Sequence, residues 1–390
     1  MSNRITVIVL ACLLALHNAQ RLSPVPLFEE WRLRLSVDYV GVGNLFSAYL
    51  IAYSLSQIPV GMLADRFDSR RMVAAGAALS VIASAMFALS DSYPLALLSR
   101  AGLGMAGAML YVPSVRYVVT AFSRERRGAV MGFVEVGAGV GQMMSLILLP
   151  YLVGQMDLSR AYLMLPVFAL LVLGGVLVAL HPTPTARSGH DQGDFRALIR
   201  SGRFHAFLVY QFLGMLVVYC VAGWLPTFLR LELGFSAVEA GMASAIWNLG
   251  LCIFSPVAGH LSDRMGNRLP VLACGACLHI LCVAVFLISR DSTVLLVTAF
   301  LAGTGSAFTS PVLMMTVGET FSWAGAGLAV SMLGTTGQMA SALSGPLFGY
   351  VLESSHTFVA VWGLALAIAL VRAPFLLAAR EQKPAHALKT

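Results

Sequence analysis

The chain has 390 residues, of which 58% are hydrophobic and 11% are charged, whereas a soluble domain carries roughly 25% charged residues. This composition requires lipid as the surrounding medium and excludes an ordinary soluble fold. Lys and Arg exceed Asp and Glu by 25 to 18. The basic residues are spread over short hydrophilic breaks, so we expect no nucleic-acid surface.

The six cysteines lie inside apolar runs and not in hydrophilic loops, so they indicate neither a disulfide framework nor a redox compartment. Cys274 and Cys277 form a CxxC with no second pair nearby. Small packing residues on a helix explain this pair better than a metal site does. We expect no metal and no cofactor.

Apolar stretches long enough to cross a hydrocarbon core of roughly 30 Å recur twelve times along the chain. They predict an all-α membrane protein with transmembrane helices near 5–26, 41–63, 72–90, 94–117, 129–150, 161–181, 206–229, 236–259, 269–289, 293–316, 326–350 and 357–378.

The first stretch also resembles a secretory signal, with Arg4 before it and small residues near Ala19. Its removal would leave five helices in the first half and six in the second, so we expect it to stay. Twelve spans place both termini on one side. Of the basic residues near span ends, sixteen fall on that side and five on the other. The positive-inside rule therefore predicts cytoplasmic termini and a location in the cell (inner) membrane.

The longest polar break lies at the middle of the chain, from His181 to Arg203, and contains Pro182, Pro184 and Gly189. This composition is typical of a linker. It predicts an N-terminal six-helix bundle at 1–181, a cytoplasmic linker at 182–204 and a C-terminal six-helix bundle at 205–390.

An internal repeat supports the division into halves. Segment 61–71 (GMLADRFDSRR) follows the second span, and segment 259–268 (GHLSDRMGNR) follows the eighth, 198 residues later. Pro113 and Pro311 share this offset. Two similar halves of six membrane helices are the sequence signature of a carrier in which one bundle moves against the other.

Segment 61–71 resembles the loop motif GxLaDRxGrR of the major facilitator superfamily, and segment 259–268 resembles its second, weaker copy. The resemblance covers the whole chain and implies the twelve-helix fold of that family, a secondary transporter, and a monomer. Asp68 and Leu269 depart from the motif. The resemblance implies gating roles for both copies, which place glycines where helices approach closely and charges near helix ends; the alternative is that these charges only set topology. The gating residues are Gly61, Asp65, Arg66, Arg70, Arg71, Gly259, Asp263, Arg264 and Arg268.

Arg21, in the first span, resembles the arginine that anion:cation symporters and organophosphate antiporters of this family often carry in helix one. Its planar guanidinium makes paired, charge-assisted bonds to a carboxylate or phosphate. The alternative is that Arg21 extends to the outer surface, because it lies about 24 Å along the helix at 1.5 Å per residue. Arg100 begins the fourth span, where we expect a structural role.

Glu135 is the acidic residue that lies well within a span. A carboxylate there is a candidate carrier of a coupling proton. The competing interpretation is an ion pair with Arg116 on the adjoining helix. A pair that opens during transport would reconcile the two.

Polar and aromatic side chains on other spans are candidates for a substrate cavity near the bilayer midplane. With Arg21, the predicted substrate-binding residues are His17, Asn18, Tyr219, Trp247, Asn248 and Gln338.

The leading hypothesis is a secondary transporter that moves a small organic anion by alternating access, with a proton as the coupling ion. The alternative is a multidrug or metabolite efflux antiporter that uses Glu135, and a metal-ion carrier is a lesser one. A receptor built on a transporter fold also stays open. An enzyme is not expected, because the chain contains no HExxH, GxSxG or P-loop motif.

Overall fold

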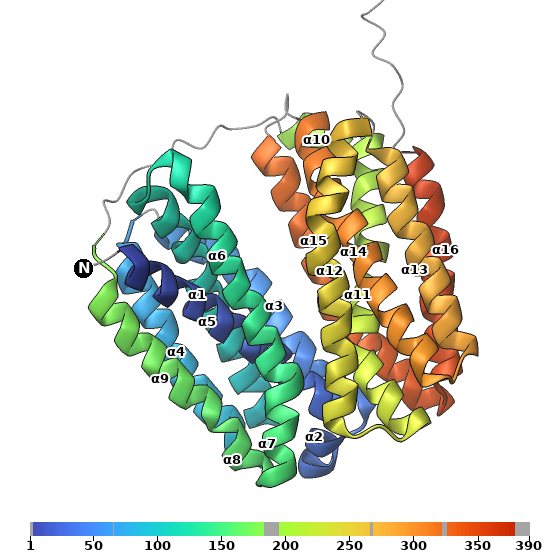
Figure 1. Ribbon diagram of the computed structural model, residues 1–390, viewed down its shortest axis with the longest axis horizontal. Helices are drawn as coiled ribbons and strands as arrows, with labels where there is room; N and C mark the ends of the chain where they lie inside the picture. The colour runs from blue at the N-terminus through green and yellow to red at the C-terminus, as the bar shows by residue number, and fades with distance from the viewer. Residues whose placement is uncertain (1–2, 65, 183–194, 266–267, 322–325, 379–390) are drawn as a thin grey trace, which may run out of the picture. The chain divides into compact units, whose positions relative to one another are not determined.

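A computed structural model describes residues 3–64, 66–182, 195–265, 268–321 and 326–378, and these residues form helices and no strand (Figure 1). The first half contains α1 (Asn3–Leu22), the 3-10 helix η1 (Val25–Leu27), α2 (Phe28–Leu35), α3 (Tyr39–Ala64), α4 (Ser69–Ala88), α5 (Tyr93–Ala121), α6 (Arg124–Met143), the π-helical segment η2 (Met144–Leu148), α7 (Leu149–Gln155), α8 (Leu158–Tyr162) and α9 (Met164–Ala179). The second half contains α10 (Phe195–Arg200), α11 (Gly202–Leu233), α12 (Ala237–Met265), α13 (Leu269–Ile288), α14 (Ser292–Thr320), α15 (Ala326–Ser355) and α16 (Phe358–Ala378).

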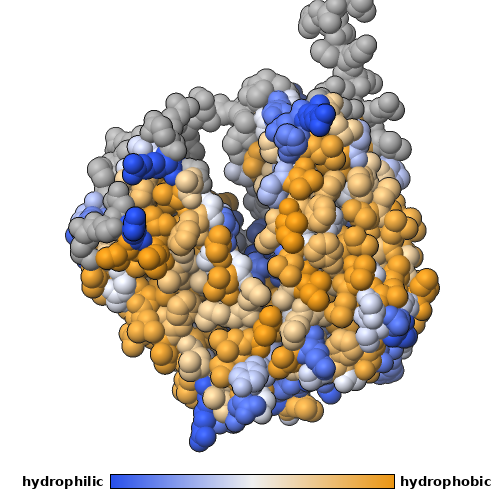
Figure 2. Space-filling model, in the orientation of Figure 1, coloured by the Kyte–Doolittle hydropathy of each residue, from blue (hydrophilic) through white to orange (hydrophobic). Residues whose placement is uncertain are grey.

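Eleven segments among these residues have the length and hydropathy needed to cross a membrane. The helix α15 has 30 residues but stands outside this set, because Thr, Gln and Ser interrupt its apolar sequence between Gly334 and Ser344. Counted with α15, the described chain holds the twelve membrane helices that its sequence predicts. Figure 2 shows hydrophobic residues over most of the visible helix sides and hydrophilic residues gathered at helix ends.

The first predicted span, 5–26, belongs to a longer helical segment that is interrupted after α1. After Leu22 the chain passes through η1 and continues as α2 to Leu35. Pro24 and Pro26 explain the interruption, because proline has no N–H to donate to the preceding turn.

The described chain separates into two compact units. The first contains residues 1–190 together with 219–246 and 341–360, so it includes one end each of α11, α12 and α15. The second contains 191–218, 247–340 and 361–390. The predicted bundles at 1–181 and 205–390 stay a prediction, and most of the predicted linker, residues 183–194, lies outside the described residues.

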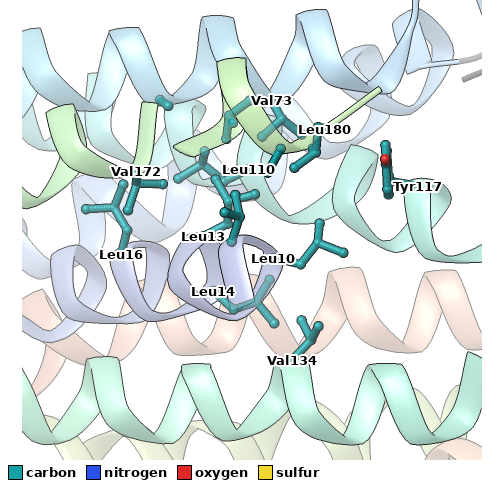
Figure 3. Packing of buried hydrophobic residues seen from close by; sticks show 14 of the residues in the cluster. Leu10, Leu13, Leu14, Leu16, Val73, Leu110, Tyr117, Val134, Val172 and Leu180 are labelled. Atoms are coloured by element: carbon teal, nitrogen blue, oxygen red, sulfur yellow. The ribbon is translucent and has the colours of Figure 1, made fainter. Parts of the chain in front are cut away.

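Each unit has its own apolar core. In the first, leucines and valines of α1, α4, α5, α6 and α9 interdigitate around Leu10, Leu13 and Leu110 (Figure 3). In the second, Phe207, Leu272 and Val312 belong to a similar cluster from α11, α13 and α14.

The helices α1 and α6 approach so closely that their backbones touch. A Cβ atom added at Gly137 would collide with the carbonyl oxygen of Ala11, and one added at Gly141 with that of Ala15. Four residues further on, Ser145 donates a hydrogen bond from its hydroxyl to the next carbonyl in this series, that of Ala19. Small residues at every fourth position thus set the distance between two helices, since lipid supplies no hydrophobic drive for their association.

We expect Gly141→Ala to destabilise the protein by at least about 2 kcal/mol, because the added methyl forces α6 away from α1. The matched control is Gly139→Ala on the same helix, where a Cβ meets nothing within 4 Å. That substitution should be neutral or stabilising, because alanine in a helix is more favourable than glycine by about 1 kcal/mol. Thermal unfolding of both variants in detergent measures the difference, and equal melting temperatures would contradict the packing argument.

Candidate functional site

Arg21 lies in the last turn of α1 and is half-buried. Its guanidinium carbon lies 5.3 Å from the centre of the Tyr219 ring on α11, within the first unit. Its Nε atom is buried and has no hydrogen-bond partner among the residues that the structure describes. A cation–π contact covers one face of a guanidinium and leaves its edge of N–H donors available. Arg21 is therefore positioned to hold a planar anion by that edge.

Four side chains from three neighbouring helices form a group that we call the aromatic cluster: His17 of α1, Tyr49 and Tyr53 of α3, and Tyr111 of α5. The His17 ring centre lies 5.1 Å from that of Tyr53 and 6.1 Å from that of Tyr111. The Tyr49 hydroxyl lies 2.8 Å from His17 Nδ1 and donates to the His17 carbonyl at 3.2 Å. Such ring separations are those of favourable aromatic pairs.

Glycine makes room for this cluster. A Cβ at Gly107 of α5 would lie 2.6 Å from both His17 Nδ1 and the Tyr49 hydroxyl oxygen. Beside the cluster, Gln142 of α6 donates a hydrogen bond to Asn18 Oδ1 at 3.3 Å, and Asn18 donates to the Leu14 carbonyl at 3.0 Å. Predicted residues His17 and Asn18 thus lie near Arg21, and both already have hydrogen-bond partners.

Arg100 of α5 has the structural role that its sequence position predicts. It is fully buried and donates to the carbonyl oxygens of Gln20 at 2.6 Å, Arg21 at 3.0 Å and Leu45 at 2.9 Å. The first two are orphan carbonyls at the end of α1, where a cation is also favoured by the helix dipole. Arg100 therefore fixes the helix end that carries Arg21.

Glu135 of α6 is exposed and has no ion-pair partner among the described residues. It lies within electrostatic reach of Tyr53 and Tyr111 of the aromatic cluster. In the part of the chain that the structure describes, Glu135 and Arg116 are not joined in an ion pair.

The other predicted binding residues belong to the second unit. Trp247 and Asn248 of α12 and Gln338 of α15 are half-buried there. The Oε1 atom of Gln338 is buried and has no hydrogen-bond partner among the described residues. Tyr219 is the predicted binding residue from the second half of the chain that contacts Arg21.

The first motif loop contacts α9 through Arg70. Arg70 donates from its guanidinium to the Leu177 carbonyl of α9 at 2.6 Å, while Arg66 and Arg71 are exposed. Asp65 lies outside the described residues. A Cβ at Gly61 would meet nothing within 4 Å, so the close helix approach expected at this glycine is not found here.

The second motif loop forms an ion-pair network within the second unit. Arg268 lies 2.5 Å from Glu319 Oε1 of α14 and 3.6 Å from Asp263 Oδ1 of α12. Arg264 is exposed. Gly259, like Gly61, has open space where a Cβ would stand.

A paired contact near the end of α11 escaped the sequence analysis. Arg230 donates from both terminal nitrogens to the two carboxylate oxygens of Glu30 on α2, each at 2.8 Å, and also to the Pro26 carbonyl at 3.1 Å. Nearby in the same unit, Glu353 of α15 accepts a hydrogen bond at 3.0 Å from the backbone N–H of Tyr39, the first residue of α3. The charges were visible in sequence, but their pairing joins residues 200 positions apart.

A second buried arginine lies in the second unit. Arg372 of α16 is 3% exposed, and its guanidinium carbon lies 3.9 Å from the centre of the Tyr210 ring. Its Nη1 lies 3.3 Å from Nδ1 of His279, whose Nε2 lies 3.1 Å from the Ser306 hydroxyl. Because Arg372 can only donate, His279 accepts at Nδ1 and carries its proton on Nε2. Among the described residues that contact it, none is a carboxylate.

Comparison with known proteins finds relatives whose names describe them as transporters. The chain is 28% identical over 254 residues to the "Probable nitrate/nitrite transporter NarK2" of Mycobacterium tuberculosis (strain ATCC 25618 / H37Rv), covering 64% of each chain. It is 26% identical over 320 residues to the "Gallate transporter" of Pseudomonas putida, covering 71% of this chain and 68% of that one. The chain thus spans less than two thirds of the NarK2 length.

Among solved structures, the fold is similar to that of a bacterial homologue of the human lysosomal transporter Spinster in its inward-facing, unoccupied conformation. The TM-score is 0.81 at 14% identity, over 97% of this chain and 98% of that one. The model of the Major Facilitator Superfamily matches residues 3–244 and 207–390. The chain therefore belongs to the Major Facilitator Superfamily and is a multi-pass membrane protein.

Proposed function

We propose that this transporter carries a small organic anion and binds it at Arg21. One observation carries the proposal: the Arg21 guanidinium is half-buried in a membrane span, and its buried Nε has no hydrogen-bond partner among the described residues. A charge within a span costs at least a few kcal/mol and is retained where it has a task. An anion supplied by the substrate would satisfy it.

The relatives support an anionic substrate. The names of two relatives specify nitrate or nitrite and gallate, which are anions at neutral pH. We propose that His17, Asn18, Tyr219, Trp247, Asn248 and Gln338 complete the binding region during the transport cycle. We also propose that the protein works as a monomer in the cell (inner) membrane, with both termini in the cytoplasm.

Coupling to protons is proposed at Glu135. A carboxylate without an ion-pair partner among the described residues is able to gain and lose a proton, and its position beside Tyr53 and Tyr111 connects it with the aromatic cluster behind Arg21. Protonation of this group and binding of an anion at Arg21 would then favour one another through their charges.

A second candidate function is efflux of a cationic drug or metabolite in exchange for protons. The unpaired Glu135 carboxylate favours it, because such a group attracts a cation. The half-buried guanidinium of Arg21, whose Nε has no hydrogen-bond partner among the described residues, lies on the same unit and opposes it.

Alternating access requires contacts that close each side in turn. We propose that Arg70, Arg268 and their partners act on the cytoplasmic side with the other motif residues, and that the Arg230–Glu30 pair acts on the opposite side. Bidentate, charge-assisted pairs are the strong members of their class.

For the anion site, we expect Arg21→Ala to weaken anion binding by roughly 10- to 150-fold, as loss of hydrogen bonds to a charged group implies. Arg21→Lys should have an anion affinity between those of the wild type and Arg21→Ala, because lysine keeps the charge but lacks the planar guanidinium. The measurement is thermal stabilisation of purified protein by gallate, nitrate and lipophilic cations, with uptake into proteoliposomes. Arg160→Gln, at an exposed pair, is the control. Stabilisation by cations that Arg21→Ala leaves intact would favour the exporter.

For proton coupling, we expect Glu135→Gln to abolish accumulation driven by a pH gradient and to preserve exchange of labelled for unlabelled substrate. The neutral amide resembles a permanently protonated carboxyl, so it cannot release a proton. Uptake into proteoliposomes with and without an imposed gradient separates the two activities. Gradient-driven accumulation at the wild-type level in Glu135→Gln would rule out this role.

For the Arg230–Glu30 pair, a double-mutant cycle with Arg230→Met and Glu30→Gln should give a coupling energy of about 1.5–3 kcal/mol. The matched control is the exposed Arg160–Asp157 pair, at 3.0 Å, for which such cycles give about 1 kcal/mol or less. Denaturation of the four forms of each pair supplies the values. Coupling no larger than that of the control would mean that the pair does not hold α2 to α11.

A further inference from the structure

We infer that the anion held at Arg21 is an aromatic monocarboxylate, with its ring against the aromatic cluster and Tyr219. The inference rests on the proposed function and narrows it to one substrate class. It follows from the number of cationic donors at the site, the nature of the neighbouring surface and the position of Glu135.

The donors at this site match a single carboxylate. Tyr219 covers one face of the Arg21 guanidinium at 5.3 Å, so binding uses the edge, which accepts one carboxylate in bidentate fashion. The nearest other guanidinium, that of Arg100, already donates to three backbone carbonyls. A second carboxylate on the same substrate would find no matching donor there.

The surface next to Arg21 is aromatic. His17 lies one helical turn before it, about 6 Å along α1 at 1.5 Å per residue, which is close to the length of a benzoate ion. At that level stand Tyr53 and Tyr111, with ring centres 5.1 and 6.1 Å from that of His17. Tyr111 and Tyr219 are half-buried and so keep accessible ring surface. A ring attached to the bound carboxylate would pack on the accessible surface of Tyr111 and Tyr219, and contacts between aromatic rings are favourable.

Hydroxyl-rich acids fit the same surroundings poorly. The Tyr49 hydroxyl is engaged by His17, and Asn18 and Gln142 bond to each other. A sugar acid would give up several hydrogen bonds to water and regain few, which is costly for each unpaired group. An aromatic ring has no such requirement.

Glu135 disfavours a second negative charge. It lies within electrostatic reach of Tyr53 and Tyr111. While Glu135 is ionised, a dicarboxylate would bring like charges together there, and once Glu135 is protonated it offers a second carboxylate no positive charge. Charge, surface and hydrogen bonding therefore all favour one carboxylate on one ring.

The test compares matched anions on the purified full-length chain. Benzoate and cyclohexanecarboxylate have the same charge and similar size but differ in aromaticity; terephthalate adds a second carboxylate, galactarate is a sugar acid, and nitrate has no ring. We expect benzoate to bind roughly 3- to 10-fold more tightly than cyclohexanecarboxylate, by thermal stabilisation and by competition for uptake. Terephthalate, galactarate and nitrate should bind more weakly still.

Variants of Tyr111 assign the preference to the cluster. Tyr111→Leu should lower the ratio of benzoate to cyclohexanecarboxylate affinity, whereas Tyr111→Phe, which keeps the ring, should preserve it. Equal binding of the two acids by the wild type, or an unchanged ratio in Tyr111→Leu, would overturn the inference. If Tyr111→Leu fails to fold, the wild-type ratio still decides.

Arg21→Ala separates this inference from the function on which it rests. Stabilisation by galactarate or nitrate that exceeds that by benzoate, and that Arg21→Ala removes, would overturn the aromatic class while leaving the anion carrier in place. If no anion in the panel gives stabilisation that depends on Arg21, the proposed function itself falls, and the inference with it.

Discussion

A membrane span gives a guanidinium no water, so every buried arginine has to find its partners inside the protein. Arg100 does so completely: three of its nitrogens donate to backbone carbonyls, two of them at the end of α1. This interaction ties α1, α3 and α5 together at one point and satisfies carbonyls that a helix end would otherwise leave unpaired. The position of Arg21, the cluster behind it and the close contact of α1 with α6 all depend on α1 being held there.

Much of this architecture could be predicted because it depends on short patterns in the sequence. Span lengths follow from runs of apolar residues, and the repeat of segment 61–71 at 259–268 identifies the family without knowledge of any contact. The structural role of Arg100 also followed from its place at the start of a span. Each span and each copy of the motif lies within about thirty residues of sequence, so that it can be recognised without knowledge of the fold.

Contacts between distant helices could not be predicted in this way. Glu135 was placed at a depth by counting residues, but counting does not tell which face of α6 it occupies or that Tyr53 and Tyr111 lie there. Gly61 and Gly259 belong to a motif, yet close packing occurs at glycines outside the motif, such as Gly137 and Gly141 on α6. Arg21 and Tyr219 meet at positions 198 residues apart, the same offset as the repeat.

Arg372 has a consequence for how the chain is made. It sits in α16, the last membrane helix of the described chain, and an arginine within a span adds to the cost of inserting the helix. Its partners Tyr210 and His279 belong to α11 and α13, which leave the ribosome earlier. Arg100 follows the same order, since its carbonyl partners on α1 and α3 are synthesised before α5. In both units, synthesis from the N-terminus presents each buried cation to a membrane that already contains the groups that receive it.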